Sequence, residues 1–214
     1  MHAIQVENVR FQYADEPGVA VDRFELEIGR SVAVLGPSGC GKSTFLHLLA
    51  GLLSPNAGAI RLLDQDLASM NAAAADRFRG ANLGLVMQRL HLIKALTVRE
   101  NIQLAIKLGR SNAPASTIDA LLERLDLANV AHQKPSTLSQ GQAQRTAIAR
   151  ALVNSPRIVL ADEPTSALDD ANAAEAIALL KAVVADSGAA LLVVTHDQRV
   201  RGALDYDFDF PVPS

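Results

Sequence analysis

An alternation of apolar and polar positions near the N-terminus gives way to unbroken apolar runs further along the chain. Across Phe24–Ile28, apolar residues alternate with glutamates, which is the period-2 pattern of a strand with one buried face. Residues 4–30 are therefore predicted to form strands. Val32–Leu35 is apolar at every position, as in a parallel strand covered on both faces, and a glycine-rich turn separates it from a helical pattern over Ser43–Leu53. This strand–turn–helix order predicts the first β–α unit of an α/β domain.

Three further segments have the length and composition of buried strands: Leu83–Met87, Arg157–Ala161 and Ala190–Thr195. Each of them ends beside a polar residue with candidate chemistry. The last segment, Asp205–Ser214, contains two prolines and is expected to be an ordered chain end rather than a further domain.

The pattern over Thr97–Val153 is almost entirely helical. Thr97 followed three residues later by Glu100 is a capping box, which marks a helix start. Apolar residues within Ile118–Leu125 recur at helical spacing and form one face of a second helix. This region therefore predicts a group of helices between two strands of the α/β core.

One more helix is predicted to begin near Ser139 and to stop at Asn154–Pro156, because proline disfavours the helical conformation of the residue before it. The whole chain is then expected to be one domain. Residues 1–93 and 154–214 would form the α/β core with its β subdomain, and residues 94–153 would form an inserted helical lobe.

The composition is that of a globular chain of 214 residues, with 49% apolar and 20% charged residues. These values exclude a disordered chain and a disulfide scaffold. The formal net charge is −3 and the basic residues are scattered, which argues against a nucleic-acid partner. Cys40 is the single cysteine, so a reducing compartment is expected.

No signal-peptide pattern occurs at the N-terminus. The longest unbroken apolar run, Ala189–Val194, is far shorter than the roughly 18 residues of a membrane-spanning helix. We therefore expect a cytoplasmic protein with no direct membrane insertion. Any work at a membrane would come through a partner.

The turn after Val32–Leu35 has the sequence of a phosphate-binding loop, because Gly36–Ser43 reads GPSGCGKS and fits G-x-x-x-x-G-K-[ST]. Its glycines let backbone N–H groups face phosphate oxygens, and the following helix presents its positive N-terminus. Lys42 is expected to reach the β- and γ-phosphates, and the Ser43 hydroxyl suits Mg²⁺. The motif predicts a P-loop nucleotide site.

Two adjacent acids follow the predicted strand Arg157–Ala161. Asp162 at the end of a buried strand beside a phosphate loop is the expected second Mg²⁺ ligand. Glu163 is expected to point to the other side of the pleat and to polarise the attacking water as a general base.

A second anion-receiving helix start is predicted at Leu138–Gln142. Ser139 and Gln142 form a capping box, and Gly141 allows a ligand to approach the backbone closely. Taken alone, this segment would be an ordinary helix cap.

Together, these motifs resemble the nucleotide-binding subunit of an ABC (ATP-binding cassette) transporter. The resemblance covers essentially the whole chain and rests on Gly36–Ser43, Leu138–Gln142, Leu160–Asp169, Gln88 and His196, which occur in the family's order. It implies an α/β fold: a P-loop NTPase core with a mixed, mostly parallel sheet, an N-terminal antiparallel β subdomain and an inserted α-helical lobe. Among subfamilies, the short length is most similar to the ATPases of lipoprotein-releasing and macrolide-exporting systems.

The resemblance implies roles for residues that would mean little alone. Tyr13 matches the aromatic residue that stacks on adenine, and Gln88 matches the glutamine that joins Mg²⁺ and the attacking water. His196 matches the histidine that contacts the γ-phosphate and holds the Glu163 region, and Asp169 matches a loop that crosses the dimer interface.

The complete set of implied site residues falls into three groups. They are the catalytic residues Lys42, Gln88, Glu163 and His196; the nucleotide-binding residues Tyr13, Gly36, Pro37, Ser38, Gly39, Cys40, Gly41, Lys42, Ser43, Thr44, Ser139, Gly141 and Gln142; and the Mg²⁺ ligands Ser43, Gln88 and Asp162.

In this family, the segment that Leu138–Gln142 matches caps the γ-phosphate of ATP bound to the other subunit. Ser139, Gly141 and Gln142 would therefore act in trans, in an ATP-dependent homodimer. Gln140 departs from the family, which usually has glycine there, whereas Gly141 matches the family's second glycine. An integral membrane permease subunit would dock near Gln88–Leu92 and hold the protein at the inner face of the membrane.

The expected activity is hydrolysis of ATP to ADP and phosphate, coupled to transport by the separate membrane subunit. A soluble, non-transport ABC ATPase of DNA repair or translation is the alternative. The repair type usually has long coiled-coil insertions with metal-binding cysteines, and the translation type has two cassettes in one chain. A small-molecule kinase would share the phosphate loop but would not need Leu138–Gln142 or Glu163.

Overall fold

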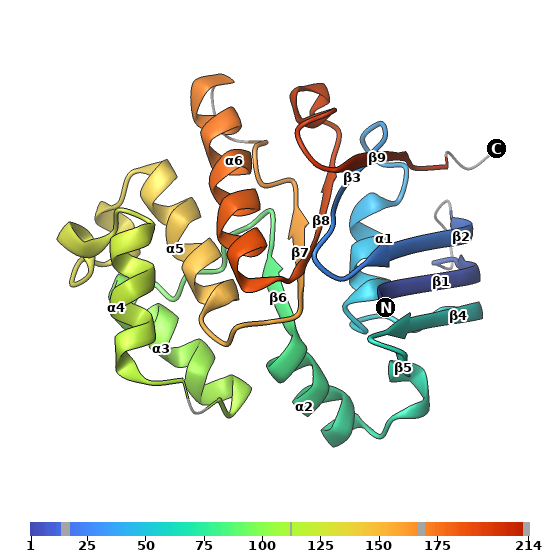
Figure 1. Ribbon diagram of the computed structural model, residues 1–214, viewed down its shortest axis with the longest axis horizontal. Helices are drawn as coiled ribbons and strands as arrows, with labels where there is room; N and C mark the ends of the chain where they lie inside the picture. Colours follow the sequence, from blue (N-terminus) through green and yellow to red (C-terminus); the bar gives the residue numbers. More distant parts are fainter. Residues whose placement is uncertain (14–17, 112, 167–169, 212–214) are drawn as a thin grey trace.

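A computed structural model of the chain describes residues 1–13, 18–111, 113–166 and 170–211. In this part of the chain, a five-stranded parallel sheet lies at the centre of the molecule (Figure 1). Its strand order is β6 (Leu83–Val86), β7 (Ile158–Asp162), β8 (Ala190–Thr195), β3 (Ser31–Leu35) and β9 (Tyr206–Asp209). The order places the ends of β6, β7, β8 and β3 beside one another at one edge of the sheet.

The central strands β3, β7 and β8 are buried at every position, and apolar except for one polar residue at an end of each, because both faces of the sheet are covered. Ala33 and Leu35 in β3 face a core shared with the helices α5 (Gln140–Leu152) and α6 (Asp170–Ser187). Val32 and Val34 face the opposite core, which contains α1 (Lys42–Leu49) and the second sheet. An unbroken apolar run is therefore the expected sequence of such a strand.

The second sheet is antiparallel and lies on the α1 side (Figure 1). Its order is β2 (Val19–Glu27), β1 (His2–Phe11), β4 (Ala57–Leu62) and β5 (Gln65–Asp66). The α/β fold class predicted from the sequence is confirmed, with parallel and antiparallel strands held in two separate sheets.

A group of helices projects from the other side of the parallel sheet (Figure 1). It contains α3 (Val98–Gly109), α4 (Ala115–Arg124) and α5, with 3₁₀ turns η2 (Ala128–Val130) and η3 (Pro135–Thr137) between α4 and α5. We call residues 94–153 the helical lobe. Both predicted capping boxes are present: Thr97 with Glu100 starts α3, and Ser139 with Gln142 starts α5.

The structure differs from the sequence-based expectation in three helices. Helix α1 ends at Leu49 rather than Leu53, because Gly51 takes a left-handed φ of 63° just after the C-cap. Helices α2 (Ala72–Asn82) and α6 were not predicted. Both are rich in alanine, and Ala75 is the one buried residue of α2, so apolar and polar positions contrast weakly in them.

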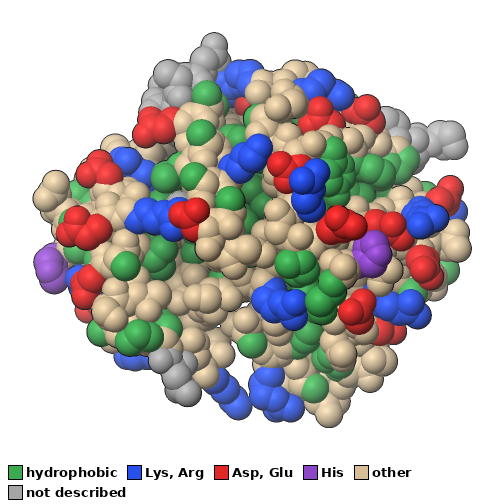
Figure 2. Space-filling model, viewed as in Figure 1, with side chains coloured by type: hydrophobic (Ala, Val, Ile, Leu, Met, Phe, Trp, Pro, Cys, Tyr) green, Lys and Arg blue, Asp and Glu red, His purple; other side chains and the backbone are tan. Residues whose placement is uncertain are grey.

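Two short 3₁₀ turns, η1 (Leu67–Ser69) and η4 (Gln198–Val200), complete the described elements. Within the described ranges, no helix is long and apolar enough to cross a membrane. Acidic and basic side chains are interspersed over the face in Figure 2, consistent with the scattered charge in the sequence.

Candidate functional site

The loop between β3 and α1 is shaped by its glycines. Gly39 and Gly41 have left-handed φ values of 81° and 101°, which favour glycine. A Cβ on Gly41 would also lie 2.8 Å from the Val19 side chain. Helix α1 begins with Gly41 as its N-cap and has no side-chain cap, so its positive N-terminus is left for another acceptor.

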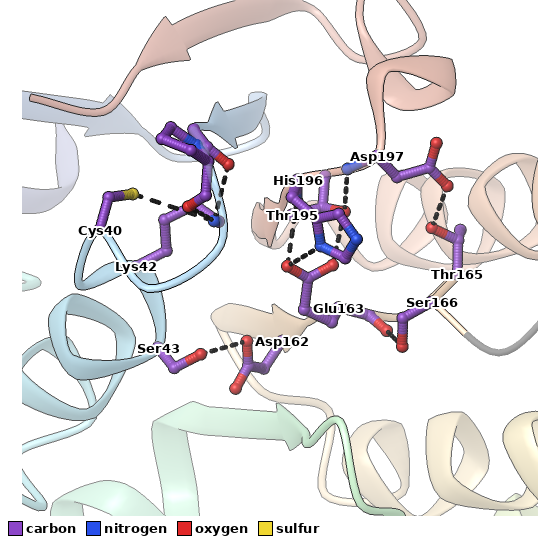
Figure 3. A network of polar contacts seen from close by, with 12 residues as sticks. Cys40, Lys42, Ser43, Asp162, Glu163, Thr165, Ser166, Thr195, His196 and Asp197 are labelled. Carbon is purple, nitrogen blue, oxygen red and sulfur yellow. Dashed lines mark hydrogen bonds and ion pairs between the residues drawn. The ribbon is translucent and has the colours of Figure 1, made fainter. Parts of the chain in front are cut away.

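Lys42 is held inside this loop and is only 5% exposed. Its ammonium donates to the Gly36 and Pro37 carbonyls, each at 2.8 Å, and lies 4.0 Å from the Cys40 sulfur (Figure 3). The cation is therefore fixed at the loop by two backbone acceptors.

Cys40 lies inside the loop with its thiol buried in the core next to α1. A Cβ on Gly36 would lie 2.9 Å from the Cys40 sulfur, so the two residues pack directly on one another. Any contact of Cys40 with a phosphate would come from its backbone. The remaining loop residues, Pro37 and Ser38, are exposed, and Thr44 is half-buried in the first turn of α1.

Ser43 and Asp162 point toward one another from α1 and the end of β7 (Figure 3). The Ser43 hydroxyl donates to Asp162 Oδ1 at 3.0 Å. Asp162 is 4% exposed; burial raises the pKa of its carboxyl, and the Ser43 hydrogen bond opposes this rise.

These two oxygen donors have the chemistry that Mg²⁺ prefers. Among the described residues, no cluster of three or more His, Cys, Asp or Glu side chains could hold a metal ion. A set with one carboxylate suits an ion that also binds water and substrate phosphates.

Glu163 turns away from Asp162 toward the end of β8. It follows the last residue of β7 and has a left-handed φ of 47°. The expected divergence of the two acids is present, but the expected reason is wrong. Glu163 lies outside the strand, so this left-handed turn and not the strand pleat redirects its side chain.

Three polar groups from the end of β8 surround the Glu163 carboxylate (Figure 3). The Thr195 hydroxyl donates to Oε2 at 2.8 Å, and the His196 backbone N–H donates to Oε1 at 3.0 Å. His196 Nδ1 lies 2.8 Å from the same Oε1. Glu163 is 8% exposed, so this arrangement fixes the orientation of a nearly buried carboxylate.

A second layer of hydrogen bonds supports these donors. The Asp197 backbone N–H donates to the Thr195 hydroxyl at 3.0 Å, and the Thr165 hydroxyl donates to Asp197 Oδ2 at 2.7 Å. Bonds from Arg199, with that from Thr165, lower the pKa of Asp197 to about 2. Thr165, Thr195 and Asp197 are not among the predicted site residues, and their only signal in the sequence is their position close to Glu163 and His196.

Gln88 and Tyr13 lie at the periphery of the cluster formed by Lys42, Ser43, Asp162, Glu163 and His196. Gln88 is exposed two residues after β6, the neighbour of β7 in the sheet, and its side chain has no hydrogen bond to any described residue. Tyr13 is 38% exposed and packs edge-on against Phe11, with ring centroids 4.8 Å apart. Phe11 pairs with Val19 in the β1–β2 hairpin, and the Val19 side chain packs against Gly41. Tyr13 therefore lies near the end of the hairpin that adjoins the loop between β3 and α1.

The N-terminus of α5 is separate from the cluster. Ser139 and Gln140 are exposed, and the polar contacts of Ser139 and Gln142 are those of their own helix start. A Cβ on Gly141 would meet nothing within 4 Å, and its φ is not left-handed. Nothing in the described part of this chain therefore requires glycine at position 141. Asp169 lies outside the described residues.

Residues 21–166 match the ABC transporter family. The chain is 39% identical over 211 residues to the lipoprotein-releasing system ATP-binding protein LolD of Hydrogenovibrio crunogenus, covering 96% of this chain and 92% of that protein. It is 40% identical over 185 residues to LolD of Pseudomonas syringae pv. tomato, covering 86% of this chain and 82% of that protein.

Solved structures show the same similarity. A dimeric structure of the ATP-binding cassette MJ0796 in a post-hydrolysis state, bound to ADP and Pi, superposes with a TM-score of 0.80 and 34% sequence identity. The match covers 92% of this chain and 89% of that chain.

Proposed function

The chain belongs to the ABC transporter family as an ATP-hydrolysing subunit, and we propose that two copies close around two molecules of Mg·ATP. The observation that carries this proposal is the placement of the α5 N-terminus. Ser139 and Gln140 are exposed, and the space beside Gly141 is open. A second chain would bring such a helix end to the phosphate that the loop of the first chain binds.

On the loop side, Lys42 and the N–H groups at the start of α1 would bind the phosphates. Tyr13 would stack on the adenine. Ser43, Gln88 and Asp162 would hold Mg²⁺, which when bound neutralises charge on the β- and γ-phosphate oxygens. Glycine N–H groups of the loop would complete the phosphate contacts.

Glu163 would orient the attacking water and accept its proton, which needs a carboxylate held in one direction. Thr195 and His196 supply that orientation through their bonds to the two carboxylate oxygens. His196 is 48% exposed on its side chain, so its other ring nitrogen remains accessible to a γ-phosphate. Ser139, Gly141 and Gln142 of the second chain would close the site from the opposite side.

Glu163→Gln tests the closed dimer. The amide keeps the shape of the side chain but cannot accept the proton, so ATP binding should persist while turnover falls by about a thousandfold. Gel filtration with Mg·ATP should then show a stable dimer. Glu123→Gln, at an exposed carboxylate of α4, is the matched control and should behave as the unsubstituted protein. A Glu163→Gln chain that stays monomeric with bound ATP would contradict the proposal.

The names of the similar proteins also suggest a substrate class. Two relatives at 39% and 40% identity are ATP-binding proteins of lipoprotein-releasing systems. We infer that this chain drives lipoprotein release through a separate integral membrane subunit, which holds it at the cytoplasmic face. These relatives favour transport over the soluble repair or translation ATPases.

The segment directly after Gln88 would dock with that subunit. Arg89 and His91 are exposed there, and Leu90 is half-buried. Alanine at any of the three should spare ATP binding yet weaken co-purification with the membrane subunit. Unchanged co-purification of all three variants would remove the assignment.

A further inference from the structure

Arg150, in the last turn of α5, binds two consecutive backbone carbonyls far away in the sequence. Its Nη1 donates to the His91 carbonyl and its Nη2 to the Leu90 carbonyl, each at 2.7 Å. The guanidinium is half-buried, and this burial lowers its pKa, although an arginine remains charged at any physiological pH. Both bonds are charge-assisted, which makes them stronger than neutral ones.

The segment that Arg150 holds is the one that follows Gln88. Residues 87–96 contain neither helix nor strand, and His91 takes a left-handed φ of 47°, which is uncommon for a non-glycine residue. Two bonds from one planar guanidinium explain how this conformation is maintained.

A second lobe residue fastens the far end of the same segment. Asn101 of α3 is 1% exposed; its Oδ1 accepts from the Ile93 N–H at 2.8 Å, and its Nδ2 donates to the Leu96 carbonyl at 3.2 Å. The backbone after Gln88 is therefore attached by side chains to the helical lobe at both ends.

Gln88 lies in the short interval between two fixed points. Strand β6 ends at Val86, and the first carbonyl held by Arg150 belongs to Leu90. Since three residues span this interval, the backbone at Gln88 has little freedom once both ends are fixed. The exposed Gln88 side chain has no partner among the described residues to hold it, so its backbone sets its place.

We propose that Arg150 is a positioning residue for Gln88. Its two hydrogen bonds to the Leu90 and His91 carbonyls fix the position of Gln88 at the edge of the parallel sheet. This inference rests on the proposed role of Gln88 toward Mg²⁺ and the attacking water. The same 13-residue helix then carries Ser139 and Gln142 at its start and the anchor of the Gln88 segment at its end.

Arg150→Lys is the informative substitution, because lysine keeps the charge and an aliphatic stem but lacks the planar guanidinium that donates two parallel hydrogen bonds. Arg150→Lys should lower turnover by about tenfold, as expected for a misplaced group near the reacting atoms, while ATP affinity changes less than about threefold. In the nucleotide-free protein, hydrogen exchange over residues 87–93 should become several-fold faster. Arg124→Met is the matched control, since Arg124 also joins a lobe helix to a distant carbonyl, that of Ala182.

A double-mutant cycle separates positioning from a general loss of stability. Because Arg150 acts through Gln88, Arg150→Lys should cost little further turnover in a Gln88→Ala background. Equal costs in both backgrounds, or unchanged exchange over residues 87–93, would overturn the inference and leave the role of Gln88 intact. Full turnover of Gln88→Ala would instead contradict the proposed function of Gln88.

Arg150→Gln, which keeps one amide donor, replaces Arg150→Lys in the cycle if the lysine variant does not fold. Failure of both variants to fold would also count against the inference, because it would assign Arg150 to the stability of the lobe.

Discussion

The loop between β3 and α1 and the N-terminus of α5 both suit a phosphate ligand, yet they are built differently. The loop lies beside the carboxyl ends of β7 and β8, and we call these parts together the strand-end region. At the strand ends, the functional side chains bind one another: Ser43 to Asp162, and Glu163 to Thr195 and His196. At α5, Ser139 and Gln142 complete only their own capping box. The first region is arranged within one chain, whereas the second presents a helix end that this chain does not use. We infer that the second region serves another copy.

Two glycines make the same contrast. A Cβ on Gly36 would lie 2.9 Å from the Cys40 sulfur and 3.3 Å from Phe210, so packing within the chain explains that glycine. A Cβ on Gly141 would meet nothing within 4 Å. Packing within the described part of the chain does not explain glycine at position 141, and we propose that the close approach of a ligand does.

Among substitutions that act on ATP binding, removing the cation of the strand-end region should have the largest effect. Lys42→Ala deletes the ammonium that the Gly36 and Pro37 carbonyls hold at the loop. The affinity for ATP should fall by about a hundredfold, because hydrogen bonds to a charged partner are lost. Titration with a fluorescent ATP analogue measures the change, with Lys107→Ala at an exposed lysine of α3 as control. An unchanged affinity would mean that the loop is not the primary site.

Adding one methyl group to each glycine sharpens the comparison. Gly36→Ala should destabilise the protein by about 1–3 kcal/mol, because the methyl group overpacks a closed space. Gly141→Ala should leave the stability of the chain unchanged or raise it by up to about 1 kcal/mol, since alanine favours a helix.

Gly141→Ala should keep its stability but lose activity. Gly141→Ala should lower turnover by about tenfold, because the methyl group occupies space needed at the phosphate in the closed dimer. Urea unfolding and phosphate release measure the two quantities. Full turnover of Gly141→Ala would show that the open space beside it is not used.

The smallest expected effect is on the stability that Asp197, which supports Thr195 in the strand-end region, contributes as the pH falls. The pKa of Asp197 falls from an ordinary 3.8 to about 2, chiefly through its hydrogen bonds with Arg199. The stability that this carboxylate contributes is present above pH 3.8 and is lost as the pH falls toward 2. Because Arg199 is exposed and solvent screens its charge, Asp197→Asn should lower the free energy of unfolding at pH 7 by no more than about 1 kcal/mol.

Denaturant unfolding of both proteins between pH 7 and pH 2 checks this linkage. The difference between Asp197→Asn and the unsubstituted protein should narrow steadily below pH 4. A difference that does not depend on pH would assign the effect to packing rather than to the charge of Asp197.

The sequence predicted those parts of the fold that rest on local pattern. The strand Ala190–Thr195 was predicted with its exact ends, because a strand covered on both faces is almost wholly apolar and this run stops at a polar residue. The capping boxes at Thr97 and Ser139 were also predicted, because they depend on residues three positions apart. Helix α6 was missed because its many alanines obscure any periodic face.

The candidate site was predictable only in its motif residues. The motifs identify Lys42, Asp162 and Glu163, but the bond from Thr165 to Asp197 and the two bonds of Arg150 join residues 32 and about 60 positions apart. No local pattern records such contacts, because tertiary packing creates them. The left-handed turn at Glu163 was likewise unpredicted, since its φ of 47° is unusual for a non-glycine residue.

Mixing two inactive variants tests most directly whether each site needs two chains. Lys42→Ala disables the phosphate loop, and Gly141→Asp places a negative charge at the start of α5, where it would repel the phosphate. Each variant alone should show no ATP hydrolysis. In a mixed dimer, one site combines both defects while the other pairs an intact loop with an intact α5. An equal mixture should therefore recover about a quarter of the unsubstituted activity, since half of the dimers are mixed and each has one intact site. No recovery at any mixing ratio would contradict the account, because it would show that each chain completes its own site.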